Sequence, residues 1–314
     1  MSTCTSASQG FGEPLAGTAA TARTWLLIEQ PGPWGAKALT QSRLDPGIGG
    51  ALEAAARGTG VRVALIRRPG RHADRHRAGR RRMYAAHTVP GAGWVREAPD
   101  GDPARLLDLD FTALGAGDPH GFDLHTGAGA HRGAPLVLVC TNGKRDRCCA
   151  LRGRPLAHEL AASGTPGVWE VTHLGGHRFS PTALVLPYGY AYGRADAPLL
   201  KEVLTAVERG RIVTEGCRGG SAWERPGQAA ELAVRRAVRE EAADVLEVVR
   251  TEGEAPRWEV TVSHVDGRSW RVTVARGASL PPRPESCGGS AATPARMDVI
   301  AVRAVAGGPV PSGA

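Results

Sequence analysis

Two strand-like runs separated by one helix occupy the middle of the chain and limit what it can fold into. Residues 135–140 (PLVLVC) and 168–172 (VWEVT) have the length and valine content of strands, and residues 151–163 (LRGRPLAHELAAS) have helical composition and spacing. A strand–helix–strand crossover is right-handed and makes its two strands parallel. The sequence therefore predicts an α/β protein in which both strands end at the same edge of one sheet, where ligand sites collect.

A similar order of elements precedes this unit. We expect strands at 24–29, 61–66, 83–88 and 183–187, and a helix within 44–58. Residues 63–72 (VALIRRPGRH) align with residues 168–177 (VWEVTHLGGH), which sets Gly70 over Gly175 and His72 over His177. We interpret the first half as a degenerate repeat of the second. Its loop EQPGPWGAKAL has no cysteine, so only the second copy can carry thiolate chemistry.

The last third of the chain has a different pattern. We expect helices at 197–209 and 228–249, and a β-hairpin around Asp266-Gly267. The Pro/Gly/Ser-rich stretch 278–296 indicates a mobile connection. The expected organisation is a flexible N-terminus (1–22), a degenerate α/β pseudo-repeat (23–130), the domain that carries the chemistry (131–212), and a C-terminal α+β extension of helix, hairpin and flexible tail (213–314).

Charge and hydropathy favour a cytoplasmic protein without a membrane segment. The chain has no apolar run near the ~20 residues that span a bilayer, and its N-terminus lacks a basic stretch followed by an apolar one. The net charge is +8, but 36 of the 39 basic residues are arginine, which fits a GC-rich coding bias as well as a selected binding surface. The run Arg67–Arg82 contains no aromatic residue for stacking bases, so we do not expect nucleic-acid binding. We interpret it as a solvated loop, or alternatively as a docking patch for an acidic partner or phosphate.

Cysteine usage indicates metal or redox chemistry. Three of the six cysteines, Cys140, Cys148 and Cys149, lie within ten residues, which fits a metal or redox loop in a reducing compartment better than a disulfide framework. Cys4 and Cys287 lie far from this group, as does Cys217. We interpret these three as isolated, buried or inert thiols.

Four metal-ligating residue types stand at the ends of the predicted elements. Cys140 ends a strand, Cys149 opens the helix, and His173 and His177 follow the next strand, so all four can converge at one sheet edge. The Gly175-Gly176 pair between the histidines favours a tight loop over a helix. Cys148 is adjacent to Cys149, so the two side chains diverge and we expect one of them to face the site.

Two thiolates and two imidazoles suit zinc, and they also suit a 2Fe-2S cluster in which His replaces Cys on one iron. Eight residues separate Cys140 from Cys149 and twenty-three separate Cys149 from His173, which excludes the common zinc-finger spacing. Two alternatives stay open. One is a structural zinc site in a binding protein, and the other is a thioredoxin-type thiol enzyme with Cys148 or Cys149 as nucleophile, although it would lack the usual C-x-x-C.

The string CTNGKRDRCC…GRPLAHEL…VWEVTHLGGHRFSPTALVLPYGYAYGR, within residues 135–193, resembles the sucrase/ferredoxin-like family. Its Cys-x8-Cys loop is also similar to that of thioredoxin-like 2Fe-2S ferredoxins. The resemblance implies a thioredoxin-like ferredoxin domain whose 2Fe-2S cluster is ligated by Cys140, Cys149, His173 and His177. The x8 spacing favours Cys149 over Cys148, which remains the alternate ligand.

The implied function is one-electron transfer coupled to a proton, with a reductase or acceptor protein as redox partner. Replacing two thiolates by neutral imidazoles removes negative charge, so the potential should lie in the range of about −150 to +300 mV rather than near about −400 mV. No paired carboxylates form a sugar-cleaving motif, so we expect an electron carrier and no sucrase activity. The sequence does not indicate an oligomeric state.

Overall fold

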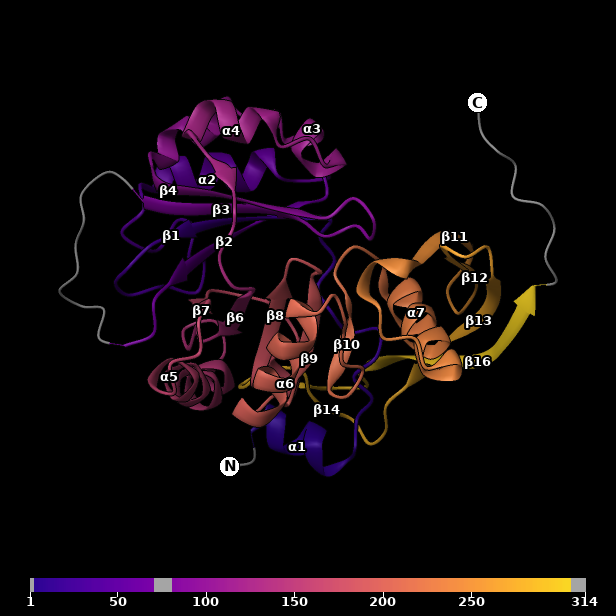
Figure 1. The fold of residues 1–314 in the computed structure, drawn as a ribbon. Helices are drawn as coiled ribbons and strands as arrows, with labels where there is room; N and C mark the ends of the chain where they lie inside the picture. The colour runs from indigo at the N-terminus through magenta and orange to yellow at the C-terminus, as the bar shows by residue number, and fades with distance from the viewer. Residues whose placement is uncertain (1–2, 71–80, 306–314) are drawn as a thin grey trace.

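The structure is a computed structural model that describes residues 3–70 and 81–305 (Figure 1). The described residues form one ten-stranded mixed sheet in the order β10-β9-β8-β6-β7-β2-β1-β3-β4-β5, a four-stranded sheet and a two-stranded sheet. This confirms the predicted α/β class. Within the described residues, no helix combines the length and the apolar character that a bilayer crossing requires.

The first half of the large sheet is built from residues 24–130. Its elements are β1 (Thr24–Glu29), α2 (Pro46–Ala55), β2 (Val61–Arg67), β3 (Arg81–His87), β4 (Trp94–Gly101), η1 (Pro103–Asp108), α3 (Phe111–Ala116), α4 (His120–Thr126) and β5 (Gly129–Ala130). The strands predicted at 24–29, 61–66 and 83–88 are confirmed as β1, β2 and β3. Figure 1 shows α2, α3 and α4 on one side of this half.

The second half contains the predicted crossover. Its elements are β6 (Leu136–Cys140), η2 (Cys149–Gly153), α5 (Arg154–Ala162), β7 (Val168–Val171), η3 (His177–Phe179), β8 (Thr182–Leu186), β9 (Tyr190–Gly193), α6 (Ala197–Glu208) and β10 (Cys217–Gly220). β6 and β7 pair in parallel, with Cys140 opposite Val171. Both strands therefore end at one edge, as predicted.

The two halves have the same strand order. β2-β1-β3-β4 and β7-β6-β8-β9 each contain one parallel pair, joined through a helix, and two antiparallel pairs. The halves meet where β2 pairs antiparallel with β7, with Ile66 opposite Val171. Gly70 ends the described part of the aligned segment, and His72 lies outside the described residues. The shared order is what our repeat interpretation requires, and the domain boundaries stay a prediction.

The two faces of the large sheet bury two separate apolar layers, and one of these layers contains the predicted ligand Cys140. Side chains along a strand alternate between its faces, so Leu136, Leu138 and Cys140 enter one apolar layer while Val137 and Val139 enter the other. The layer with Cys140 also includes Trp25 from the first half and Trp169 from the second, so it is continuous across the junction of β2 and β7.

The C-terminal region contains the predicted hairpin and a shorter helix than predicted. It consists of α7 (Arg225–Val238), η4 (Ala243–Val245), β11 (Leu246–Glu254), β12 (Arg257–His264), β13 (Ser269–Ala278), β14 (Arg283–Pro284), β15 (Ala291–Ala292) and β16 (Ala295–Val305). The predicted hairpin is confirmed as β12 and β13. The helix predicted for 228–249 is wrong beyond Val238, because Arg239 adopts a left-handed conformation with φ 55° and the chain from Leu246 pairs with β12.

An N-terminal segment and the stretch 278–296 both contact the second half. Residues 4–10 form α1 (Cys4–Gly10), which packs against η3 and β14. The stretch 278–296, expected to be a mobile connection, contains the β14–β15 pair and places Arg283 in a buried ion pair with Glu13. Figure 1 shows α1 next to β14, although these segments are far apart in the sequence.

Candidate metal centre

The loop after β6 is held by its own polar groups. Asp146 and Arg145 donate backbone N–H groups to the carbonyl oxygen of Asn142 at 3.1 and 3.2 Å, and Cys149 N donates to Asp146 O at 3.1 Å. Gly153 lies so close to the carbonyl of Cys140 that any side chain there would overlap it. The loop and η2 therefore fold back onto the end of β6, which brings Cys149 to Cys140.

The loop between the two histidines is tight, as predicted. Gly175 and Gly176 adopt left-handed φ values of 73° and 70°, which favour glycine. The turn stacks the imidazoles of His173 and His177 with their centroids 4.8 Å apart and their planes at 29°. Arg62 and Arg218 hold this turn by donating to the carbonyl oxygens of His173 and Gly175, each at 3.2 Å.

The four predicted ligands lie near one another, and one thiol is in direct contact with one imidazole. Cys149 Sγ lies 3.2 Å from His177 Nδ1, His173 stacks on His177, and Cys140 shares one buried core layer with Cys149. Neither Cys140 nor His173 belongs to a group of three or more described residues whose ligand atoms all lie within 4.8 Å of one another. Both thiols are buried, at 1% and 0% exposure, whereas both imidazoles are half-buried. His173 Nδ1 is buried and makes no hydrogen bond with the described residues.

The protonation of the two thiols is coupled. A hydrogen bond from the Cys149 thiol, aided by His173, holds the pKa of Cys140 well below its ordinary value in spite of burial. The same hydrogen bond, together with burial, raises the pKa of Cys149. Burial and the neighbouring His173 lower the pKa of His177. A bound cation would favour the deprotonated form of both thiols, since metals bind deprotonated thiols.

Asp146 joins this site, a contribution that the sequence did not reveal. Ligand atoms of Asp146, Cys149 and His177 lie within 4.8 Å of one another, so this buried Cys/Asp/His group could bind a metal. Asp146 is not among the ligands that we predicted from the sequence. Its carboxylate accepts a hydrogen bond of 2.8 Å from the backbone of Cys148, as turn aspartates do, and this local signal does not separate a turn from a ligand.

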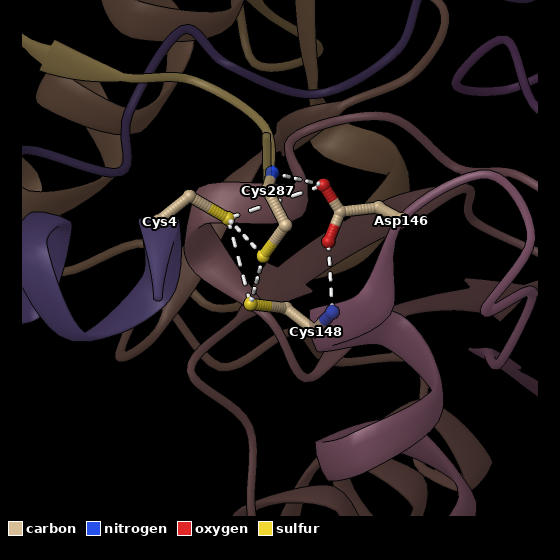
Figure 2. A group of neighbouring side chains, drawn as sticks. All are labelled: Cys4, Asp146, Cys148 and Cys287. Atoms are coloured by element: carbon tan, nitrogen blue, oxygen red, sulfur yellow. Dashed lines mark hydrogen bonds between the residues drawn. The ribbon is translucent and has the colours of Figure 1, made fainter. Parts of the chain in front are cut away.

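Cys148 faces away from these residues. Its Sγ lies 3.0 Å from Cys287 Sγ and 3.5 Å from Cys4 Sγ (Figure 2). The interpretation of Cys4 and Cys287 as isolated thiols is therefore wrong, because folding brings together residues that no local motif connects. Cys217 lies on β10, where burial raises the pKa of its thiol to about 12.

A basic cavity opens beside His173. Its volume is about 400 Å³, and it lies between the first half and the loops of the candidate site. Its lining includes four basic residues, Lys37, Arg57, Arg62 and Arg145. The run Arg67–Arg82, proposed as an alternative docking patch, lies mostly outside the described residues. Its first residue, Arg67, is buried against Glu170 at 2.6 Å and is not available to a partner.

Comparison with known proteins identifies one family pattern. A model of the family described as sucrase/ferredoxin-like matches residues 15–219, more than half of the chain, and this range contains all four predicted ligands. Curated proteins and solved structures give no match.

Proposed function

The chain belongs to the sucrase/ferredoxin-like family, and from this premise we propose that Cys140, Cys149, His173 and His177 hold a 2Fe-2S cluster in a one-electron carrier. Such a cluster, when bound, accepts and donates single electrons. The observation that carries the proposal is the pairing of like ligands: the two thiols are buried in one core layer, and imidazole stacks on imidazole. This is the division that a cluster with two Cys on one iron and two His on the other requires.

The imidazole nitrogens support the same ligand set. His177 Nδ1 faces the Cys149 sulfur at 3.2 Å, and His173 Nδ1 is a buried atom without a hydrogen bond among the described residues. A buried polar atom that lacks a partner is costly, and ligation of iron would satisfy it. Each ring would then keep Nε2 available to hold a proton, which links electron transfer to pH.

The half-buried histidines suggest where electrons enter. The two sulfurs are enclosed by the core, whereas His173 lines the basic cavity. A partner that presents acidic groups would be steered to the rim formed by Lys37, Arg57, Arg62 and Arg145. We therefore propose a redox partner protein, reductase or acceptor, that docks at this edge.

The strand order supports the expected thioredoxin-like frame. In each half a parallel pair joined through a helix is followed by two antiparallel strands. We propose that the second half is the ferredoxin-type domain and that the first half is a degenerate copy. The first copy supports the site from outside, since Gly35 O accepts a hydrogen bond of 3.0 Å from the Asn142 side chain.

Metal analysis tests the proposal against its rivals. Protein purified anaerobically should be red-brown, contain about two iron and two sulfide ions per chain, and give the EPR signal of a reduced 2Fe-2S centre. Cys149→Ser should lose the cluster, whereas the adjacent Cys148→Ser should keep it.

A colourless, iron-free chain whose zinc depends on Cys149 and His177 would favour the structural zinc site, for which the Asp146–Cys149–His177 group is the best support. A colourless, metal-free chain with disulfide reductase activity that depends on Cys148 or Cys149 would favour the thiol enzyme.

A further inference from the structure

Three thiols and one carboxylate meet beside the proposed cluster ligands (Figure 2). Cys4 Sγ lies 3.5 Å from both Cys148 Sγ and Cys287 Sγ, and these two sulfurs lie 3.0 Å apart. Asp146 Oδ2 lies 4.0 Å from Cys4 Sγ. The four residues come from α1, the loop after β6, and the stretch between β14 and β15.

The carboxylate orients two of the thiols. Asp146 is 3% exposed, and its two oxygens accept the backbone N–H groups of Cys148 and Cys287, each at 2.8 Å. These contacts fix both cysteine backbones with their side chains turned toward Cys4, as Figure 2 shows.

Ion pairs hold the segments that carry Cys4 and Cys287 in place around this group. Arg178, directly after His177, donates to Glu13 at 2.7 Å and to Glu285 at 2.5 Å. Arg283 donates to the other oxygen of Glu13 at 3.1 Å. The N-terminal and C-terminal segments are therefore tied to the second half independently of the thiols, so the thiols meet in a supported pocket.

We propose that Cys4, Cys148, Cys287 and Asp146 bind one zinc ion in a closed tetrahedral site. Structural zinc takes four protein ligands, with Zn–S near 2.3 Å, and this places tetrahedral sulfurs roughly 3.8 Å apart. The three sulfurs are 3.0 to 3.5 Å apart, so small outward movements of the side chains would bring them to this separation.

A disulfide is the competing chemistry, and the geometry favours it less. An S–S bond of about 2.05 Å would use two sulfurs. It would leave the third sulfur as a buried thiol beside the Asp146 carboxylate. Cys4 is equally far from both other sulfurs, which matches one shared centre better than one bonded pair.

The site would link three distant parts of the chain next to the redox centre. Cys148 directly precedes Cys149, so zinc on Cys148 would fix the loop that supplies the proposed iron ligand. Cys4 and Cys287 lie outside the family match at 15–219, so the zinc site is not part of the family pattern. It also does not depend on iron binding by the other ligand set.

Metal counting on the full chain tests this site. Protein expressed with zinc, desalted and analysed for zinc should contain one ion per chain, and zinc K-edge X-ray absorption should show three sulfur neighbours and one oxygen neighbour. Cys287→Ser and Cys4→Ser should lower zinc affinity about 10-fold or more. Cys217→Ala is the matched control, because it removes a buried cysteine that belongs to neither site.

Cys140→Ser separates this proposal from the preceding one: it should remove iron and leave zinc in place. Zinc that disappears with Cys140→Ser but survives Cys287→Ser would overturn the site. So would a Cys148–Cys287 disulfide in zinc-free, anaerobically prepared chain. The absorption spectrum of the unaltered protein keeps the test decisive if Cys4→Ser does not fold, because an oxygen- and nitrogen-rich shell would exclude three thiolates.

Discussion

Arg218 donates a hydrogen bond of 3.2 Å to the carbonyl oxygen of Gly175, inside the turn that brings His173 and His177 together. Its side chain is fully buried, and its other hydrogen bonds go to Thr18. It forms no ion pair with a carboxylate among the described residues. Burial and then Arg178 lower the pKa of Arg218 to about 9, so it keeps its charge at neutral pH. An uncompensated cation beside the proposed cluster favours the reduced state.

Replacing Arg218 should therefore lower the reduction potential. Arg218→Gln keeps a hydrogen-bond donor but loses the charge, and we expect a decrease of roughly 60 mV, which is a tenfold change in the one-electron equilibrium constant. Arg218→Lys keeps the charge and should retain most of the potential. Potentiometric titration followed by EPR measures both variants, and equal potentials for Gln and Lys would refute a charge effect.

Gly175 and Gly176 lie in the same turn, but we expect alanine substitution to have different effects at the two positions. Both have left-handed φ values, so alanine at either position costs about 1–2 kcal/mol of backbone strain. A methyl group at Gly175 meets open space, whereas one at Gly176 would overlap the Arg218 guanidinium. Gly176→Ala should therefore destabilise the protein more and also alter the EPR spectrum. Urea unfolding and EPR of the two variants compare them, with Gly175→Ala as the internal control.

The strands and the crossover could be predicted because they depend on local pattern. The continuous apolar run 136–140 is typical of a strand buried on both faces, and the Pro-Leu-Ala-His-Glu-Leu run of α5 has the spacing of one buried helix face. β4 and β9 were not predicted, because their charged or glycine- and tyrosine-rich sequences lack a clear apolar alternation. Gln228–Val249 was predicted as one helix, since composition does not reveal that residues from Leu246 have a strand partner in β12.

The candidate site also has a part that the sequence predicts and a part that it does not. Spacing and resemblance could select four residues, because one supersecondary unit carries all of them: Cys140, Cys149, His173 and His177. Cys4, Cys287 and Arg218 could not be selected, because their contacts depend on the packing of α1, the 278–296 stretch and β10 around that unit.

The buried pair of Arg67 and Glu170 joins the two halves of the large sheet. Arg67 donates two hydrogen bonds to Glu170 at 2.9 and 2.6 Å, and both side chains are 5% exposed. Arg67→Met removes this buried ion pair while keeping the Glu170 carboxylate, and should cost roughly 3–5 kcal/mol in urea unfolding. Arg67→Met/Glu170→Gln should recover much of that loss, because the double variant removes both charges of the pair. Arg250→Gln, in an exposed pair with Glu252, is the control and should change stability little.

The proposed histidine ligation predicts a pH-dependent potential. If reduction adds one proton at an imidazole Nε2, the potential falls by about 59 mV per pH unit above the pKa of the oxidised centre. His173→Cys should abolish part of this slope and lower the potential, since a thiolate replaces a neutral ligand. Cyclic voltammetry between about pH 6 and 10 measures the slope. A flat profile in the unaltered protein would contradict ligation by two histidines.

We expect His87, which belongs to neither proposed metal site, to make the stability of the protein depend on pH. The residue is 3% exposed, its Nδ1 lies 2.8 Å from Thr24 Oγ1, and burial followed by the charge of Arg23 lowers its pKa from 6.5. As the pH falls below 6.5, the unfolded chain binds a proton at His87 before the folded chain does. The free energy of unfolding therefore decreases by up to about 1.4 kcal/mol per pH unit until the pH reaches the pKa of His87 in the folded chain. Above pH 6.5 His87 is neutral in both states and contributes no slope. His87→Gln should flatten the acid side of the urea-unfolding profile, whereas His158→Gln, on the exposed face of α5, should leave it unchanged. An unchanged slope in His87→Gln would show that another group controls acid unfolding.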